Sequence, residues 1–291
     1  MPALSLIVCV YNERDLLRRL LDLAEGCYDD LVVVHDGPDM AGVKEVVKAY
    51  GGRFFENEKR GSLEAQSPFA WPLAKFDWIF RPDADEFPGE EMRQWLQDFR
   101  RAPEPNQDVS GYTCIWPLWN GRKVISKNVW TGRLFVFNRQ RVRFFGMIEQ
   151  GLVPDGRYEP TQLVLFHQPN RKSYGIGNVL LRKQAFRWRE MIAKSLLGKP
   201  TDLPCWRWTD PKWPKDWEEI RKRPLRTAAQ RLVIMTFRGL RAQWRADRRF
   251  YFEAALNGPI HHALICLKFW QERRRSPSAS SSPPSESGPN R

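Results

Sequence analysis

The sequence predicts an α/β fold with an open, mostly parallel sheet, and two observations carry the prediction. Short apolar runs rich in β-branched residues alternate with stretches in which apolar residues recur at helical spacing. Polar or acidic residues directly follow several of the apolar runs. Alternating strand and helix patterns are typical of parallel sheets covered by helices. The 291 residues are enough for one such domain with a helical appendage.

Most of the sheet is expected in the first hundred residues. The apolar run 4–10 predicts a strand buried on both faces, and leucines at helical spacing predict a helix over 16–24 that ends before Gly26. The later part predicts antiparallel strands within 111–145 and a further strand at 163–166. The remaining predicted elements are strands at 31–34, 53–55 and 77–81, and helices at 43–49, 182–197 and 224–252.

The charge pattern indicates an anionic partner. The net charge is +13, and the segment 221–249 holds ten basic residues and one acidic residue, Asp247. Nucleic acid, an acidic membrane surface and a phosphate-bearing small molecule all fit such an excess. Because the first hundred residues mix acids with bases, the excess belongs to the C-terminal part of the chain.

The cysteines and the hydropathy pattern predict a cytoplasmic protein. The five cysteines are scattered, odd in number and never spaced Cys-x-x-Cys, which indicates reduced thiols and no zinc ribbon. The first apolar run is too short for a signal peptide, and no apolar stretch of about 18 residues predicts a transmembrane helix.

Three polar clusters follow predicted strands, and they indicate a ligand site. Ligands of open α/β sheets bind at the carboxyl ends of the strands, and the clusters stand at three such ends. Two carboxylates spaced i, i+2 in extended backbone face the same side, where a divalent cation with oxygen ligands would relieve their repulsion. The clusters are Tyr11-Asn12-Glu13, Asp36 with Asp39, and Asp83-Ala84-Asp85-Glu86.

The three clusters and their strands resemble one enzyme family. The segments Ser5-Leu-Ile-Val-Cys-Val-Tyr-Asn-Glu13, Leu31-Val-Val-Val-His-Asp-Gly37 and Asp77-Trp-Ile-Phe-Arg-Pro-Asp-Ala-Asp-Glu86 are similar to motifs of the family-2 glycosyltransferases of the GT-A fold. Gly146-Met-Ile-Glu-Gln150 and Leu163-Val-Leu-Phe-His167 resemble the bacterial lipopolysaccharide-core β-glucosyltransferase branch, although Ile148 replaces a histidine of that branch. The second motif departs from the family at Pro38.

The resemblance implies an inverting, metal-dependent transfer of a sugar from a nucleotide-diphosphate donor, by default a UDP-hexose, to a glycan or glycolipid. It implies a nucleotide-sugar-binding half over 1–102 and a catalytic half of the same domain over 103–200. The charge and composition of the remaining chain predict a basic Trp-rich helical extension over 201–275 and a Ser/Pro/Gly-rich disordered tail over 276–291.

The resemblance also assigns roles to individual residues. Tyr11 and Glu13 would line the nucleotide pocket, Asp36 would accept a hydrogen bond from the base, and Asp83 would approach the ribose or the metal. Asp85 would bind Mn²⁺ or Mg²⁺. The role of Asp39 stays open.

Further residues would complete the site. His167 would join the metal or the diphosphate, and Arg171 and Arg60 would contact phosphate oxygens through their planar guanidinium groups. Glu149 would take the proton of the acceptor hydroxyl. The alternatives are a structural salt bridge from Glu149 to a neighbouring arginine, or Asp155 or Glu86 as the base.

The C-terminal part leaves two interpretations open. A helical stripe formed by Leu225, Leu232 and Leu240, with arginines around it and Trp206, Trp208, Trp213 and Trp217 before it, predicts either docking on an anionic inner-membrane surface or packing with a solvated basic face. The alternative function is a catalytically degenerate transferase or a nonenzymatic protein that binds an anionic ligand or nucleic acid. Nucleic acid is the less favoured of these partners, although the basic and aromatic residues of the C-terminal part suit it.

Overall fold

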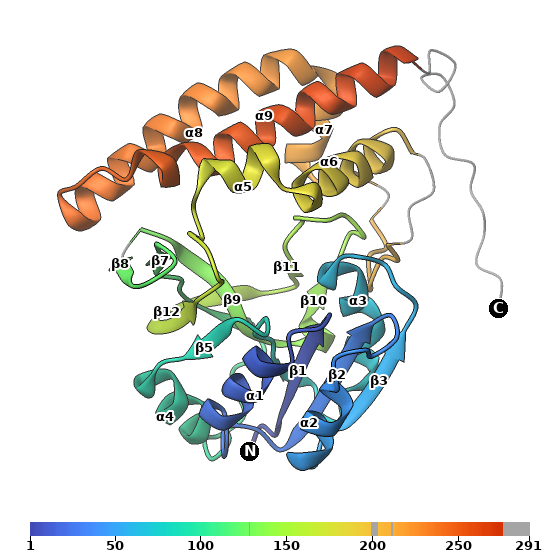
Figure 1. Cartoon of the computed structure of the whole chain (residues 1–291), viewed down its shortest axis with the longest axis vertical. Helices are drawn as coiled ribbons and strands as arrows, with labels where there is room; N and C mark the ends of the chain where they lie inside the picture. Colours follow the sequence, from blue (N-terminus) through green and yellow to red (C-terminus); the bar gives the residue numbers. More distant parts are fainter. Residues whose placement is uncertain (128, 199–202, 211, 276–291) are drawn as a thin grey trace. The chain divides into compact units, whose positions relative to one another are not determined.

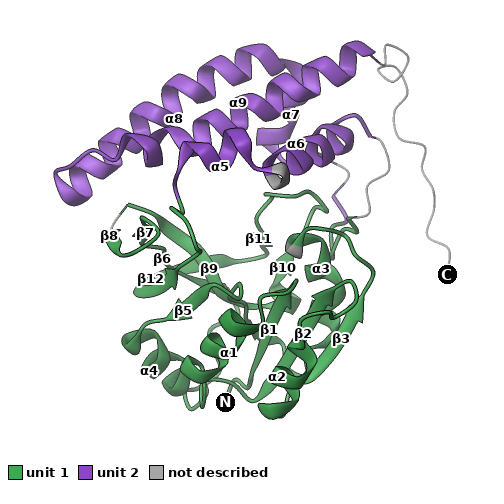
Figure 2. Ribbon diagram, in the orientation of Figure 1, with its two compact units in different colours: residues 1–173, 202–208 green, residues 174–201, 209–291 purple. Residues whose placement is uncertain are grey.

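The structure, a computed structural model, describes residues 1–127, 129–198, 203–210 and 212–275 (Figure 1). Two compact units make up the chain (Figure 2). The α/β unit comprises Met1–Ser173 and Asp202–Trp208, and the helical unit comprises Tyr174–Thr201 and Thr209–Arg291. The helical unit therefore begins before the expected boundary at 201. The predicted disordered tail over 276–291 lies outside the described residues.

The α/β unit alternates strands and helices in its first half and is richer in strands in its second half. Its strands are β1 Leu4–Val10, β2 Asp30–Asp36, β3 Arg53–Asn57, β4 Trp78–Phe80, β5 Glu86–Pro88, β6 Val109–Ile115, β7 Leu118–Trp119, β8 Val124–Ser126, β9 Thr131–Asn138, β10 Val142–Arg143, β11 Val153–Pro154 and β12 Arg157–His167. Its helices are α1 Arg14–Leu23, α2 Val43–Ala49, α3 Leu63–Ala70 and α4 Glu90–Phe99, with 3-10 turns at Trp71–Leu73 and Arg139–Arg141.

The central sheet confirms the predicted fold class. Its strand order is β3-β2-β1-β4-β9-β6-β12-β5. Strands β3, β2, β1 and β4 run parallel, β9 is antiparallel to both β4 and β6, β12 is parallel to β6, and β5 is antiparallel to β12. Because β2, β1 and β4 are parallel neighbours, their carboxyl ends lie at one edge of the sheet, as the sequence predicts.

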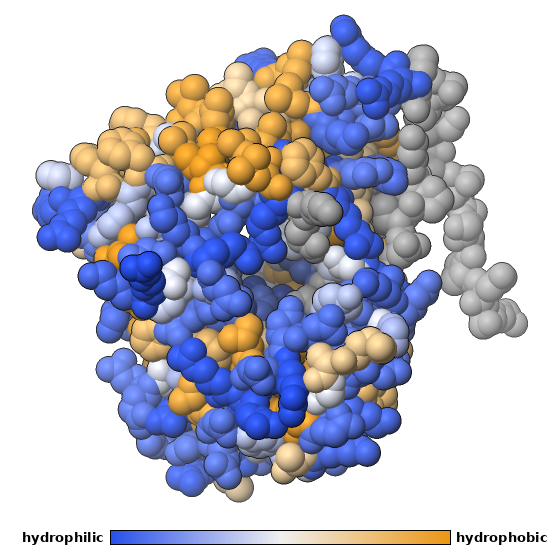
Figure 3. Space-filling view, viewed as in Figure 1, coloured by the Kyte–Doolittle hydropathy of each residue, from blue (hydrophilic) through white to orange (hydrophobic). Residues whose placement is uncertain are grey.

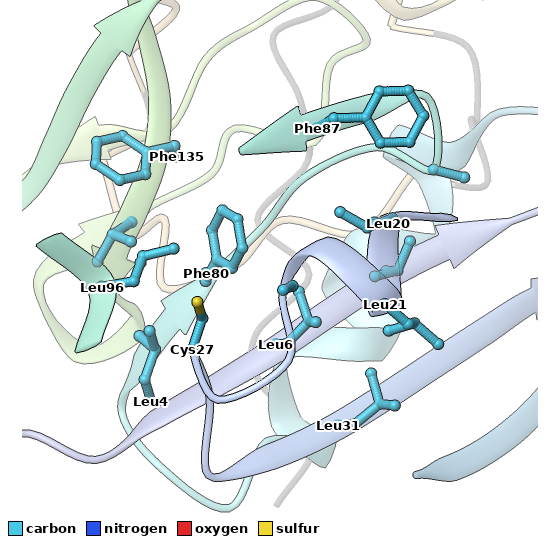
Figure 4. Close-up of a cluster of buried hydrophobic side chains, with 14 of the residues drawn as sticks. Leu4, Leu6, Leu20, Leu21, Cys27, Leu31, Phe80, Phe87, Leu96 and Phe135 are labelled. Carbon is cyan, nitrogen blue, oxygen red and sulfur yellow. The ribbon is translucent and has the colours of Figure 1, made fainter. Parts of the chain in front are cut away.

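Helices cover both faces of the sheet, and a hydrophobic core lies on each face. The side chains of β1 alternate between these two cores. Leu4 and Leu6 point into the larger core, which α1, α2 and α4 close (Figure 4). Ile7 points to the opposite face, where it packs with strand β2, helix α3 and Trp71. The ring of Trp71 contacts Phe137 and Phe144 edge-on at centroid distances of 6.0 and 5.8 Å.

The helical unit is built on a pair of long helices. Helices α8 and α9 pack against each other, and Gly239 of α8 lies so close to Ala255 that an added Cβ would stand 3.5 Å from it. The predicted helix over 224–252 ends at Asp247, because Arg248 takes the left-handed conformation with φ +55°. The helices are α5 Ile176–Leu181, α6 Lys183–Leu196, α7 Lys215–Lys222, α8 Pro224–Asp247 and α9 Phe252–Arg275. Helices α5 and α6 pack on α9, which places them in this unit.

No helix within the described ranges is both long enough and apolar enough to cross a lipid bilayer.

We expect Gly146→Ala to lower the free energy of unfolding of the α/β unit by roughly 1–3 kcal/mol. Gly146 has φ +76°, and a Cβ would lie 2.8 Å from the carbonyl oxygen of Leu203 and 3.2 Å from the amide nitrogen of Cys205. Urea denaturation would measure the loss. Gly151→Ala is the matched control, because nothing lies within 4 Å of a Cβ there. Equal stability of the two variants would contradict this account of Gly146.

Candidate active site

Asp36 holds the loop that leaves β3. Its side chain is 2% exposed. Its Oδ1 accepts a hydrogen bond from the backbone N–H of Arg60 (2.6 Å), and its Oδ2 accepts one from the N–H of Gly61 (2.8 Å). The side-chain amide of Gln66 also donates to Oδ1. These bonds tie the predicted phosphate-contacting residue Arg60 to the end of β2. A hydrogen bond that a base donates to Asp36 stays a prediction.

The same loop contacts the first polar cluster. Lys59 Nζ donates to the hydroxyl of Tyr11 at 2.9 Å and lies 4.4 Å from the centre of its ring. The backbone N–H of Tyr11 donates to Glu13 Oε2 at 2.5 Å, across Asn12 with φ +68°. The structure therefore brings the predicted nucleotide-pocket residues Tyr11 and Glu13 next to the loop of Arg60.

Asp39, whose role the sequence left open, caps helix α2. Its carboxylate accepts hydrogen bonds from the backbone N–H groups of Ala41, Val43 and Lys44 at 3.1, 3.1 and 2.8 Å. Burial alone would raise the pKa of Asp39, but these N–H donors lower it below its ordinary value.

Arg133 of β9 binds two of the acids in the third cluster. Its guanidinium donates to Glu86 Oε1 and Oε2 at 3.1 and 3.0 Å and to Asp83 Oδ2 at 3.2 Å. The side chain of Glu86 is fully buried, whereas that of Asp83 is 37% exposed. Although burial disfavours its charge, the carboxylates of Glu86 and Asp83 raise the pKa of Arg133. The cluster is therefore a buried ion network with one carboxylate, Asp83, at the surface.

Asp85 faces His167, and their binding of a shared metal ion stays a prediction. Oδ2 of Asp85 lies 3.3 Å from Nε2 of His167, which stands at the end of β12. The imidazole stacks on Trp116 at a centroid distance of 4.3 Å. Burial would raise the pKa of Asp85, but the hydrogen bond and electrostatic interaction with His167, and the positive charge of Arg171, lower it. Arg171 therefore acts on Asp85 electrostatically.

The Asp85–His167 pair fits a divalent cation that also binds a ligand. Adjacent ligands of an octahedral ion with bonds of about 2.1 Å lie about 3 Å apart, close to the Oδ2–Nε2 separation. A carboxylate oxygen and an imidazole nitrogen suit Mn²⁺ or Mg²⁺, which usually keep positions for substrate phosphates and water. Among the described residues no group of three His, Cys, Asp or Glu side chains could hold a metal.

A pocket of about 310 Å³ adjoins the ion network. Arg133 belongs to both, and the pocket also contains Arg81, which follows β4. Two carboxylates, Glu64 and Glu149, line it together with Gln150. The remaining lining residues are Ser67, Trp71, Gly132, Leu134, Phe144, Gly151, Leu152 and Tyr158.

Glu64 and Glu149 are joined through the backbone. The N–H of Glu149 donates to Glu64 Oε2 at 2.9 Å, and Glu149 has φ +64°, a conformation that favours glycine. Burial, reinforced by the negative charge of Glu149, raises the pKa of Glu64 to about 7, although the Glu149 N–H and Arg81 oppose the rise. The structure thus places one carboxyl group that titrates near neutrality beside the predicted base.

The other predicted candidates for the base have arginine partners. Asp155 pairs with Arg143 at 2.7 Å and with Arg207 at 3.2 Å, and Glu86 is buried against Arg133. Two of the arginines considered as partners for Glu149 pair elsewhere, since Arg139 bonds Asp77 and Arg143 bonds Asp155. Glu149 is the candidate that lines the pocket.

The sequence patterns did not identify Glu64, Arg81 or Arg133 as site residues. Glu64 lies on α3, a helix that the sequence pattern did not predict, and Arg133 lies in a strand region without a recognisable motif. The one signal for Arg133 would have been the burial of Glu86, because a buried carboxylate requires a cation nearby. That burial becomes apparent only in the folded structure.

The first part of the chain matches a known family. Residues 5–145 match the model described as Glycosyl transferase family 2. This segment covers all three polar clusters, Glu64 and Arg133, and it ends before Glu149. On this match the protein is a glycosyltransferase. No curated protein matches the sequence.

Solved structures resemble the chain at low identity. The mannosyltransferase PcManGT from Pyrobaculum calidifontis, in complex with GDP-Man and Mn²⁺, is 16% identical, with 94% of this chain and 88% of that chain covered and a TM-score of 0.48. TarS 1–349 from S. aureus is 12% identical, with 93% and 92% covered and a TM-score of 0.41. Identities and scores this low establish nothing about substrate.

We expect Arg133→Met to lower the free energy of unfolding by about 3–5 kcal/mol, because it leaves the buried carboxylate of Glu86 without its cation. Adding Glu86→Gln should recover part of the loss. Urea denaturation at pH 7.5 would test both. Arg93→Met is the control, since Arg93 pairs with a carboxylate that is 81% exposed and should cost less than about 1 kcal/mol. A loss no larger than the control's would show that the ion network is dispensable.

We expect the free energy of unfolding of Glu64→Gln to increase relative to that of the unchanged protein as pH rises from 5 to 8. Folding raises the pKa of Glu64 from 4.5 to about 7. The neutral form therefore contributes stability that is fully present below about 4.5 and is lost as pH approaches about 7 and above. Glutamine does not titrate. Urea denaturation at four pH values would measure the difference, with the exposed Glu91→Gln as control, and a pH-independent difference would contradict the raised pKa.

Proposed function

We propose that the protein transfers a sugar, with inversion, from a nucleotide-diphosphate donor to the hydroxyl of a glycan or glycolipid. By resemblance the donor is a UDP-hexose. The observation that carries the proposal is the approach of Asp85 to His167. They come from segments 82 residues apart, and their facing atoms lie 3.3 Å apart at the ligand-binding edge of the sheet.

The nucleotide would bind at the ends of β1, β2 and β4. Tyr11 is 37% exposed and offers an aromatic ring. Glu13, Asp36 and Asp83 would provide oxygen acceptors for base and ribose, and Arg60 a cation for the phosphates. Burial raises the pKa of the Cys9 thiol on β1 to about 12, and both Asp36 and Asp83 act on it electrostatically, which supports their placement around one strand end.

Asp85 and His167 would hold Mn²⁺ or Mg²⁺. The ion, when bound, neutralises the charge that grows on the diphosphate as it leaves. Arg171 is exposed and acts electrostatically on Asp85, which supports a role for its guanidinium in binding oxygens of the same diphosphate.

Glu149 would act as the base from the pocket. Its carboxylate removes the proton of the acceptor hydroxyl while that oxygen forms a bond to the anomeric carbon and the bond to the diphosphate oxygen breaks. Attack on the face opposite the leaving group inverts the anomeric configuration. The neighbouring pocket arginines, Arg81 and Arg133, would favour the ionised form of the acids around them.

The acceptor side follows the resemblance to the lipopolysaccharide-core β-glucosyltransferases, so we propose a bacterial core glycan or glycolipid as acceptor. The enzyme would work in the cytoplasm at the inner face of the membrane. The substitution of Ile148, which is fully buried, for the histidine of that branch puts an apolar side chain where the branch has a polar one.

Isothermal calorimetry with UDP, GDP and dTDP, each with Mn²⁺ and with EDTA, would test the donor site. We expect one nucleotide to bind in the presence of Mn²⁺, and Asp85→Ala to weaken that binding at least tenfold through loss of a metal ligand.

The matched control is Asp98→Ala, which removes an exposed carboxylate on α4. It should leave binding unchanged. If folded protein binds none of the nucleotides, the donor site as proposed is wrong, and the nonenzymatic alternative gains weight. If Asp85→Ala binds as well as the unchanged protein, the metal assignment is wrong.

A further inference from the structure

One face of α8 exposes large apolar side chains. Val233 and Phe237 are each 68% exposed, and Trp244 is 45% exposed. Spacings of four and seven residues place the three on the same side of the helix. Apolar surface gathers over α8 and α9 in the space-filling view (Figure 3). A helix in a globular protein normally turns such a stripe inward, so this stripe indicates a partner.

The stripe continues into the α8–α9 turn as an aromatic cluster. The ring of Phe250 stacks on Trp244 at a centroid distance of 5.4 Å and an interplanar angle of 18°. The ring of Phe252 lies 5.9 Å from that of Phe250. Phe250 and Phe252 are 49% and 61% exposed.

Hydrogen bonds fix the turn that carries this cluster. Gln243 is 1% exposed, and its side-chain amide bonds both the N–H of Tyr251 (2.7 Å) and its carbonyl oxygen (3.2 Å). The hydroxyl of Tyr251 donates to Asp247 at 3.0 Å. The aromatic cluster is therefore held in place before any partner arrives, which lowers the entropic cost of binding.

Arginines form a row beside the stripe. Arg238, Arg241 and Arg245 are exposed and recur at three- and four-residue spacing. Arg248 lies with its guanidinium carbon 5.7 Å from the centre of the Trp244 ring. The one acid between 221 and 249, Asp247, is bonded to Tyr251.

We propose that this apolar–arginine face, defined by Val233, Phe237, Trp244, Phe250 and Phe252 with Arg238, Arg241 and Arg245, docks on an anionic lipid surface. Aromatic and aliphatic side chains enter the boundary between headgroups and acyl chains, while arginines bind the phosphates. The face does not depend on the donor chemistry, although it would bring a transferase to a glycolipid acceptor.

Two other occupants fit the face less well. A second copy of this chain would bring the same arginines opposite each other, and like charges repel. Nucleic acid would use the arginines and the aromatic rings, but exposed aliphatic side chains such as Val233 and Ile234, which is 45% exposed, have no role against phosphates or base faces.

The residues that the structure exposes differ in part from those that the sequence predicted for a membrane-docking surface. Trp206 packs against Trp71 in the α/β unit at a centroid distance of 5.6 Å, and Trp217 is 4% exposed, so neither adds to a docking surface. The exposed stripe runs through Phe237 and Trp244 instead of the predicted Leu240.

Co-sedimentation of the full chain with phosphatidylcholine vesicles, with and without one-third phosphatidylglycerol, would test the proposal. We expect binding to the anionic vesicles that weakens with salt, needing neither nucleotide nor metal, so that failure of the donor site would leave this result intact. Phe237→Ala should weaken binding roughly tenfold. Arg241→Gln and Arg245→Gln should each weaken it about fivefold.

Met40→Ala is the matched control, because Met40 is an 85% exposed apolar side chain of the α/β unit. Thermal unfolding of each variant would show that it remains folded. Equal binding by all variants, or none by the unchanged protein, would overturn the proposal. A dimer that Phe237→Ala disperses, or oligonucleotide binding that the same variants abolish without vesicle binding, would overturn it in favour of a protein or nucleic-acid partner.

Discussion

The buried pair of Glu86 and Arg133 is the interaction on which the site depends. A fully buried carboxylate needs a cation and hydrogen-bond donors, and Arg133 reaches it from another strand of the sheet. The guanidinium carbon of Arg133 lies 5.3 Å from the centre of the Trp116 ring, and the same ring stacks on His167. The same network therefore orders the acidic turn, the pocket wall and the imidazole that faces Asp85.

Strands β1, β2 and β4 of the parallel half could be predicted because they are buried on both faces. Such strands appear in the sequence as nearly continuous apolar runs, as in Leu4–Val10. Helix α3 escaped prediction because Pro68 lies inside it and because it is enclosed by other elements, so its apolar residues show no amphipathic spacing. Because helix α3 was not predicted, Glu64, which lies on it, was not identified as a site residue either.

The site could be predicted only as a set of chemical groups. Asp85 and His167 were paired through a resemblance, and the fold brings them together. The sequence does not show which carboxylate oxygens are occupied by hydrogen bonds within the protein, because those bonds depend on the conformation of the loops. Asp36 and Asp39 look equivalent after β2, yet one holds a loop and the other caps a helix. The end of α8 could not be predicted either. Arg248 ends the helix in a left-handed conformation that sequence patterns assign to glycine.

The path of the chain limits how this protein can be dissected. The polypeptide passes between the two units three times, because the stretch that includes Trp206 returns to the α/β unit from the middle of the helical one. There Trp206 exchanges two backbone hydrogen bonds with Phe144, at 2.8 and 2.9 Å. A gene fragment that stops at residue 173 would encode a sheet domain without this tryptophan. A catalytic fragment would have to retain the returning segment around Trp206, either through a shortened linker or by circular permutation.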